Sequence, residues 1–216
     1  MLFDILGSDI SAQSKFITLV SYVFALLIAL ICHEVAHGIV AKWNGDDTAF
    51  LAGRLSLNPA KHLDPIGTIC LLLIGFGWAK PVPINTRNFK NFRVGLFTVS
   101  IAGITVNLIL ALIFAGIYHL LNGLVSRVVE IPSELALNLF LIVYNLSILS
   151  VLINLTLMVF NLLPVNPLDG FRVVESLGAG KSEAIDKYIN FCRRNGAWLT
   201  LAVILFVNFT GILGGI

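Results

Sequence analysis

The residues Ile31-Cys32-His33-Glu34-Val35-Ala36-His37-Gly38 place a His-Glu-x-x-His motif inside a long apolar segment. Residues i and i+4 of a helix lie on one face, so His33 and His37 project side by side with Glu34 next to them. Two imidazoles supply two of the three protein ligands that a catalytic zinc ion needs, and a glutamate beside them supplies a base for an attacking water. The spacing predicts a hydrolytic zinc site on an apolar helix.

The surroundings of this motif argue against a chance match. Between Phe16 and Val40 the two histidines and Glu34 are the only charged or imidazole side chains. One ionisable side chain at membrane depth costs about 2.5–3.5 kcal/mol on insertion scales, and a buried carboxylate without a partner is unfavourable. Metal ligation supplies the partner, so a zinc site explains the motif better than a solvated helix face does.

The composition is typical of a membrane protein. Hydrophobic residues make up 57% of the 216 residues and charged residues only 12%, and the mean hydropathy is +0.93. This is about half the charge of an ordinary soluble domain. The net charge of +2, with no basic run among aromatic residues, indicates no nucleic-acid partner. Three cysteines without paired spacing support neither a disulfide framework nor a cysteine-type zinc site.

Four apolar segments are predicted to cross the bilayer as helices. A further apolar segment, residues 66–78, is too short to cross and is predicted to be a re-entrant or shallow helix. Asp4 and Asp9 precede the first span in place of a basic leader, so we expect no removable signal peptide. We expect an all-α polytopic membrane protein with about four full transmembrane helices plus the short one, as a single domain over residues 1–216. The four predicted spans are residues 15–43, 93–121, 134–163 and 196–211.

Two short β segments are predicted between the helix over residues 15–43 and the helix over residues 93–121. Residues 54–57, Arg-Leu-Ser-Leu, have the pattern of a short strand, and the proline-containing residues 80–89 are expected to be extended. The prolines of the second segment lack N–H groups on one edge, whereas Val82 and Ile84 keep donors and acceptors on the opposite edge. That edge is a candidate for binding an extended substrate peptide by strand addition, and the alternative is a plain connector.

The distribution of basic residues predicts the orientation in the membrane. Residues 42–93 contain seven Lys or Arg and residues 164–196 contain five, whereas residues 122–136 contain one. If residues 66–78 do not cross, the positive-inside rule places both basic loops in the cytoplasm. The metal motif then lies toward the cytoplasmic face of an integral multi-pass protein, which in a prokaryote would belong to the cell membrane.

Asp169 is the candidate for the third protein ligand of the zinc ion. Two prolines end the preceding helix, and Asp169-Gly170 is predicted to form a turn that directs the carboxylate back toward the bundle. Irregular backbone at the membrane end of a helix needs a polar cavity to face, which favours a ligand over an ordinary Asp-Gly turn. Asp64 and Glu175 are the alternative ligands.

Several motifs together resemble those of one family. They are His33-Glu-Val-Ala-His-Gly38, Arg54-Leu-Ser-Leu-Asn-Pro59, Asp64-Pro-Ile-Gly67, Gly77-Trp-Ala-Lys-Pro-Val-Pro-Ile-Asn85, Asn161-Leu-Leu-Pro164 and Leu168-Asp-Gly170. The chain resembles the site-2 protease family of intramembrane zinc metalloproteases, related to peptidase family M50, and in particular its short members without PDZ or CBS domains.

The resemblance implies one Zn²⁺ held by His33, His37 and Asp169, with Glu34 as the base. It also implies that Asn161 steadies the substrate or the developing oxyanion. Gly103-Ile-Thr-Val-Asn107 corresponds to the family's Gly-Pro-x-x-Asn motif, with isoleucine in the proline position. Asn107 is therefore a further candidate for substrate binding, together with Val82 and Ile84.

These observations predict a zinc-dependent endopeptidase that cleaves transmembrane or membrane-associated protein substrates near the cytoplasmic face of the lipid bilayer. The alternative is a non-proteolytic zinc-binding membrane protein or transporter. Glu34 discriminates between the two, because a site that only binds metal has no use for a base. The isolated His62 and His119 are expected to have structural roles.

Overall fold

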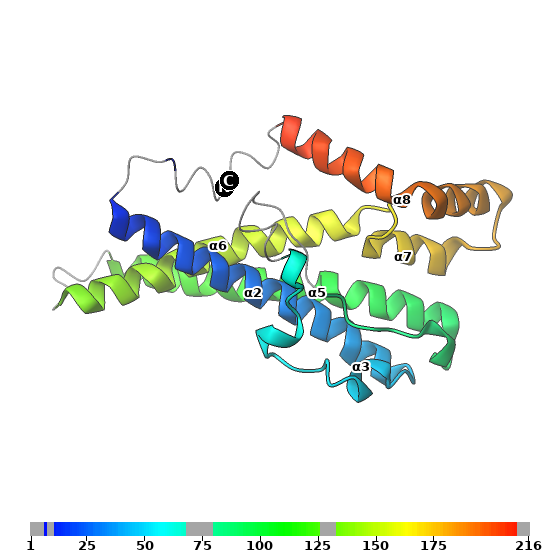
Figure 1. The fold of residues 1–216 in the computed structure, drawn as a ribbon, viewed down its shortest axis with the longest axis horizontal. Coiled ribbons are helices and arrows are strands. Elements are labelled where there is room, and N and C mark those ends of the chain that lie inside the picture. Colours follow the sequence, from blue (N-terminus) through cyan, green and yellow to red (C-terminus); the bar gives the residue numbers. More distant parts are fainter. Residues whose placement is uncertain (1–6, 8–10, 68–79, 126–132, 211–216) are drawn as a thin grey trace.

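Three long helices form the body of the protein (Figure 1). The structure, a computed structural model, describes residue 7 and residues 11–67, 80–125 and 133–210. The long helices are α2 (Ala12–Trp43), α5 (Phe92–Val125) and α6 (Glu134–Leu162), and each packs against the other two. Each is long and apolar enough to cross a membrane. The chain is therefore an all-α, integral multi-pass membrane protein, as predicted.

Polar contacts between the helices fix their relative directions. Near the start of α2, Gln13 donates to Asn138 near the start of α6 at 2.8 Å. Farther along, Ser21 donates to the carbonyl of Ile142 at 3.1 Å. At the other end of α2, Asn44 donates to Thr98 near the start of α5 at 2.9 Å. α2 is therefore parallel to α6 and antiparallel to α5, and the C-terminal ends of α2 and α6 lie at the same end of the bundle, as the charge distribution predicts.

The β segments predicted between the helices now seen as α2 and α5 are absent from the described residues. α3 (Thr48–Leu51) and the 3-10 helices η1 (Pro59–Lys61) and η2 (Thr86–Asn88) occupy parts of this region. Arg54 donates through its guanidinium to the carbonyl of Lys80 at 2.6 Å, and the ring of His62 contacts the carbonyl of Ser56 at 2.6 Å. Side chains thus satisfy carbonyls that a strand ladder would have paired. His62 has the structural role expected of it, and residues 68–78 of the predicted re-entrant segment lie outside the described part.

The C-terminal part of the chain forms two helices beyond α6. α7 (Asp169–Gly178) follows the proline-containing break, and α8 (Glu183–Thr210) is packed against it through a cluster of Phe171, Ile189 and Cys192. Asp169 and Gly170 begin α7 and do not form the predicted turn. The expected last span, residues 196–211, is largely the second half of α8, which is not among the three candidate spans of the described chain. A fourth crossing stays a prediction.

Candidate metal centre

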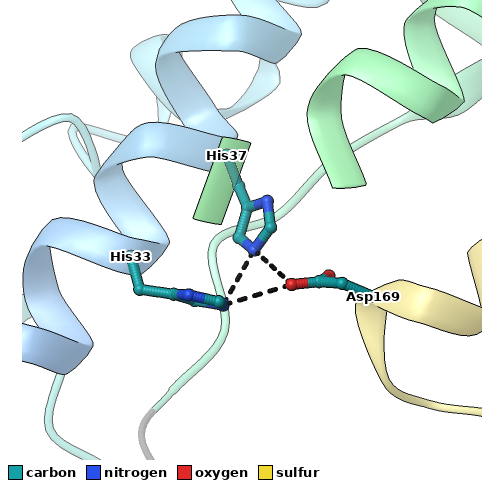
Figure 2. A group of neighbouring side chains, drawn as sticks. All are labelled: His33, His37 and Asp169. Atoms are coloured by element: carbon teal, nitrogen blue, oxygen red, sulfur yellow. Dashed lines mark hydrogen bonds and ion pairs between the residues drawn. The ribbon is translucent and has the colours of Figure 1, made fainter. Parts of the chain in front are cut away.

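His33, His37 and Asp169 meet in the buried interior of the bundle (Figure 2). The Nε2 atoms of His33 and His37 are 3.0 Å apart. The Oδ2 atom of Asp169 lies 3.3 Å from Nε2 of His33 and 3.2 Å from Nε2 of His37. The two imidazoles are nearly perpendicular, with an interplanar angle of 88°. Three possible ligand atoms from α2 and α7 thus converge on one point.

This geometry fits a zinc ion. In a tetrahedral site with metal–ligand distances of about 2.0–2.2 Å, neighbouring ligand atoms lie about 3.3–3.6 Å apart. The three observed separations of 3.0, 3.2 and 3.3 Å are close to this value. Two nitrogens and one carboxylate oxygen also form a donor set that zinc accepts in hydrolytic sites, where a fourth position stays open. The residues present therefore fit one zinc ion.

Residues of α5 hold the two histidines in place. The Nδ1 atom of His37 contacts the backbone carbonyl of Val99 at 2.7 Å. A proton on Nδ1 would leave Nε2 as the nitrogen that binds a metal ion, which is how outer contacts commonly orient metal-binding histidines. A Cβ atom on Gly103 would lie 2.5 Å from Cε1 of His33 and 2.6 Å from Nε2 of His37. The absence of a side chain at Gly103 lets both rings lie against α5.

The backbone between α6 and α7 places Asp169. A Cβ atom on Gly170 would lie 2.2 Å from the carbonyl oxygen of Leu162, so only glycine permits α7 to begin this close to the end of α6. Burial acts to raise the pKa of the Asp169 carboxyl, but hydrogen bonds and charge from His33 and His37 outweigh it and lower that pKa. The group is therefore a carboxylate, the form that binds a cation.

Glu34 follows His33 in the sequence and contacts the segment after residue 79. Its Oε2 atom accepts a hydrogen bond from the backbone N–H of Val82 at 2.8 Å. Gly38, at the end of the zinc motif, faces the same segment, because a Cβ atom there would lie 3.1 Å from a methyl group of Val82. The proposed base and the proposed substrate-binding edge therefore touch each other.

Comparison with known proteins identifies the family. The sequence model of peptidase family M50 matches residues 21–203, a range that includes His33, His37 and Asp169. The chain belongs to peptidase family M50. This M50 chain is thus a zinc metalloprotease by family, and its resemblance to the site-2 proteases is confirmed.

Two relatives of this M50 chain carry names of the same kind. The protein named "Putative zinc metalloprotease YwhC" of Bacillus subtilis (strain 168) is 45% identical over 155 residues, 72% of this chain and 68% of that protein. "Putative zinc metalloprotease Rip2" of Mycobacterium tuberculosis (strain H37Rv) is 31% identical over 155 residues, 69% of this chain and 54% of that protein. No solved structure matched the chain.

The alternative ligands of the M50 metal centre have other partners. Asp64 accepts a hydrogen bond from the backbone N–H of Gly67 at 2.8 Å, as a residue at the start of a helix does. Glu175 forms an ion pair with Arg193. In the described residues, His33, His37 and Asp169 are the single group of His, Cys, Asp and Glu side chains with the arrangement of a metal site.

The predicted substrate-binding residues of the M50 site differ in whether their side chains already have partners in the protein. Asn161 donates to the carbonyl of Leu157, one turn earlier in α6, at 3.0 Å. Ile84 packs against a core cluster of Ala41, Phe89 and Val99. Asn107 is fully buried, and neither its amide nitrogen nor its amide oxygen has a partner among the described residues. It lies one helical turn from Gly103, which touches both histidines.

Sequence reasoning missed the positioning groups of the M50 centre. The carbonyl of Val99 orients His37, and the N–H of Val82 binds Glu34. Backbone groups leave no trace in residue types, so neither contact had a signal. Gly103 did have one, because it opens the Gly-x-x-x-Asn motif four residues before Asn107. A glycine in that motif could have been predicted to adjoin the metal ligands.

Proposed function

We propose that this protein is a zinc-dependent intramembrane endopeptidase that cleaves membrane-embedded protein substrates near the cytoplasmic face. The observation that carries the proposal is the buried group of His33, His37 and Asp169 in a bundle of apolar, membrane-length helices, with Glu34 one residue away. Polar ligands at this depth require a function that offsets the cost of burying them. Hydrolysis inside the bilayer is such a function.

The cytoplasmic location of cleavage rests on charge and on helix direction. The C-terminal ends of α2 and α6 lead into the two basic loops, residues 42–93 and 164–196, and the second loop contains Asp169. Basic loops stay on the cytoplasmic side of a membrane. A substrate would be cut in the cytoplasmic half of the bilayer, and in a prokaryote the enzyme would reside in the cell membrane.

Each residue of the centre has a defined part in the proposed reaction. A zinc ion, when bound to His33, His37 and Asp169, would lower the pKa of a water and polarise the scissile carbonyl. Glu34 accepts the proton of the attacking water and passes it to the leaving amine. Asn107 offers a buried amide that can bind a substrate backbone group, since both its polar atoms lack described partners.

The substrate must be extended when it is cut, because a helix occupies its carbonyls with internal hydrogen bonds. Residues 80–85 form neither a helix nor a strand, and Val82 contacts Glu34; Val82 and Ile84 are the proposed pairing residues. The N–H of Val82 is engaged by Glu34 at 2.8 Å. Strand addition at Val82 would therefore exchange the carboxylate for a substrate carbonyl and release Glu34 next to the bond to be cut.

Glu34→Gln is the direct test. The substitution keeps the size of the side chain and leaves the three ligands intact, but removes the base. We expect zinc content to remain near one ion per chain while membrane-protein fragments seen by proteomics in the wild-type strain disappear. Glu183→Gln is the matched control, because Glu183 is exposed and forms an ion pair with Lys187 far from the centre. Identical fragments in the Glu34→Gln and wild-type strains would favour a non-proteolytic zinc protein or transporter.

A further inference from the structure

A groove opens between the N-terminal end of α5 and the last turn of α7. Its volume is about 290 Å³. Two cations stand at this groove, and no acidic residue lines it within the described chain. The lining residues are Arg93, Val94, Phe97, Ser176, Leu177 and Lys181. The groove thus combines positive charge with an apolar wall.

Both cations are available to an anion. Arg93 uses one N–H to donate to the carbonyl of Ala179 at 2.8 Å, which fixes its guanidinium and leaves its other donors free of described partners. The same guanidinium lies 3.8 Å from where a Cβ atom on Gly180 would be, next to Lys181. The Lys181 side chain is exposed and has no partner among the described residues.

The acids near the groove in the sequence have partners of their own. Glu175 is paired with Arg193, and Glu183 is paired with Lys187. Asp186 accepts the backbone N–H of Gly180 at 2.8 Å. None of these carboxylates therefore neutralises the groove through a described contact with Arg93 or Lys181.

From the position of the groove at the start of a membrane-length helix, we expect it to lie at the level of the lipid headgroups. α5 begins at Phe92, directly after a basic loop, and runs from there as a helix of membrane length. The side chains of Val94 and Leu177 are each 53% exposed, although they are apolar. A lipid is the ligand that joins a phosphate to an acyl chain, and basic pockets between helices on the cytoplasmic side suit anionic headgroups.

We propose that this groove binds an anionic phospholipid, with its phosphate between Arg93 and Lys181 and an acyl chain along Val94, Phe97 and Leu177. A free phosphate ion would use the same cations but would gain nothing from the apolar wall. Since α7 carries Asp169 at its start and Leu177 in its last turn, the lipid would sit on the helix that supplies the third metal ligand. The site is separate from the proposed proteolysis.

The test is lipid binding to the full chain purified in a maltoside detergent, measured by native mass spectrometry. Phosphatidylglycerol is compared with phosphatidylcholine of the same acyl chains. We expect the wild type to prefer phosphatidylglycerol. Each cation near a membrane surface contributes about fivefold to such binding, so Arg93→Gln with Lys181→Gln should weaken it about 25-fold. The control, Arg87→Gln with Lys187→Gln, removes the same charge at exposed cytoplasmic positions and should bind as wild type.

Two single variants complete the test. Lys181→Gln examines one cation by itself, and Leu177→Gln distinguishes a lipid from a free phosphate ion. Lys181→Gln alone, which breaks no described contact, should weaken phosphatidylglycerol about fivefold even if the double variant fails to fold. Leu177→Gln should weaken the lipid but leave the binding of inorganic phosphate unchanged. The lipid assignment is wrong if both phospholipids bind equally or if the control loses as much as the groove variant. It is also wrong if Leu177→Gln has no effect while millimolar inorganic phosphate displaces the lipid, which would indicate a site for free phosphate.

Discussion

The carboxylate of Glu34 and the backbone N–H of Val82 are joined by a 2.8 Å hydrogen bond across 48 residues of sequence. Glu34 belongs to the zinc motif on α2, whereas Val82 belongs to the loop that precedes α5. Arg54 holds the same segment through the carbonyl of Lys80 at 2.6 Å. The position of the proposed base therefore depends on a loop that has no regular secondary structure.

Val82→Pro removes this hydrogen bond, because proline has no N–H, while the neighbouring residues 81 and 83 are already prolines. We expect proteolysis to fall by about 10–100-fold, because the variant loses both the contact that positions Glu34 before substrate binds and the N–H proposed to pair with the substrate carbonyl. Zinc content should stay near wild type, because no ligand is touched. The measurement is the cleavage rate of a membrane substrate in parallel with metal analysis.

Val82→Ala is the control for this variant, since it shortens the side chain and keeps the N–H. Its cleavage rate should remain within a few-fold of wild type. Equal losses in both variants would show that the Val82 side chain matters and that the hydrogen bond to Glu34 does not.

Asp169→Ala tests the third ligand. Loss of one of three protein ligands should lower zinc affinity by more than about 100-fold, the upper end of what an outer contact contributes. Purified Asp169→Ala protein should contain little zinc after dialysis, whereas Glu34→Gln protein should retain it. Atomic emission spectrometry of the two variants gives the answer. Full zinc content in Asp169→Ala would move the third ligand elsewhere and contradict the arrangement in Figure 2.

Gly103→Ala tests the packing of α5 against the histidines. The added methyl group would lie 2.5 Å from His33 and 2.6 Å from His37, so the rings must move. Overpacking of this kind costs about 1–3 kcal/mol, and we expect zinc affinity to fall by about 10–100-fold with it. Gly116→Ala is the matched control on the same helix, because a Cβ atom there meets nothing within 4 Å. If the two variants bind zinc equally, Gly103 has no part in the centre.

The sequence predicts the helices well because hydropathy and length determine them. The helices predicted over residues 15–43, 93–121 and 134–163 are observed over Ala12–Trp43, Phe92–Val125 and Glu134–Leu162. The candidate metal ligands are also predicted, since the i, i+4 spacing of the two histidines and the proline break before Asp169 are local signals, and the structure brings the three residues together. The basic loops then predict that both lie on one side of the membrane.

The connection between α2 and α5 shows where local patterns fail. Arg54-Leu-Ser-Leu57 alternates as a strand does, but the ring of His62 contacts the carbonyl of Ser56, and the guanidinium of Arg54 donates to the carbonyl of Lys80. No residue type marks that the N–H of Val82 meets Glu34, because the contact arises from the path of the whole loop. Long-range pairings of backbone groups depend on tertiary structure and cannot be derived from periodicity.

Asp46 is the residue that attaches this loop to the end of α2. It is fully buried, and its carboxylate accepts the N–H of Asn85 at 2.7 Å and the amide of Asn88 at 2.8 Å. Thr48 donates to it as well. Burial acts to raise the pKa of the Asp46 carboxyl, but the hydrogen bonds from Thr48, Asn85 and Asn88 outweigh it and lower that pKa. The ionised form is therefore the one that stabilises the fold.

Because the pKa is lower in the folded protein, the stabilisation is fully present above the unfolded pKa of about 4 and is lost as the pH falls through the folded value. In the wild type, Thr48, Asn85 and Asn88 donate to the two carboxylate oxygens of Asp46. Asp46→Asn leaves them one oxygen, which should lower the free energy of unfolding by about 1–3 kcal/mol at pH 7. We expect the difference in thermal stability between wild type and Asp46→Asn to be constant from pH 5 to 7 and to shrink toward pH 3. Groups common to both proteins, including the histidines, cancel in this difference. A difference that persists unchanged at pH 3 would show that Asp46 acts by shape and not by charge.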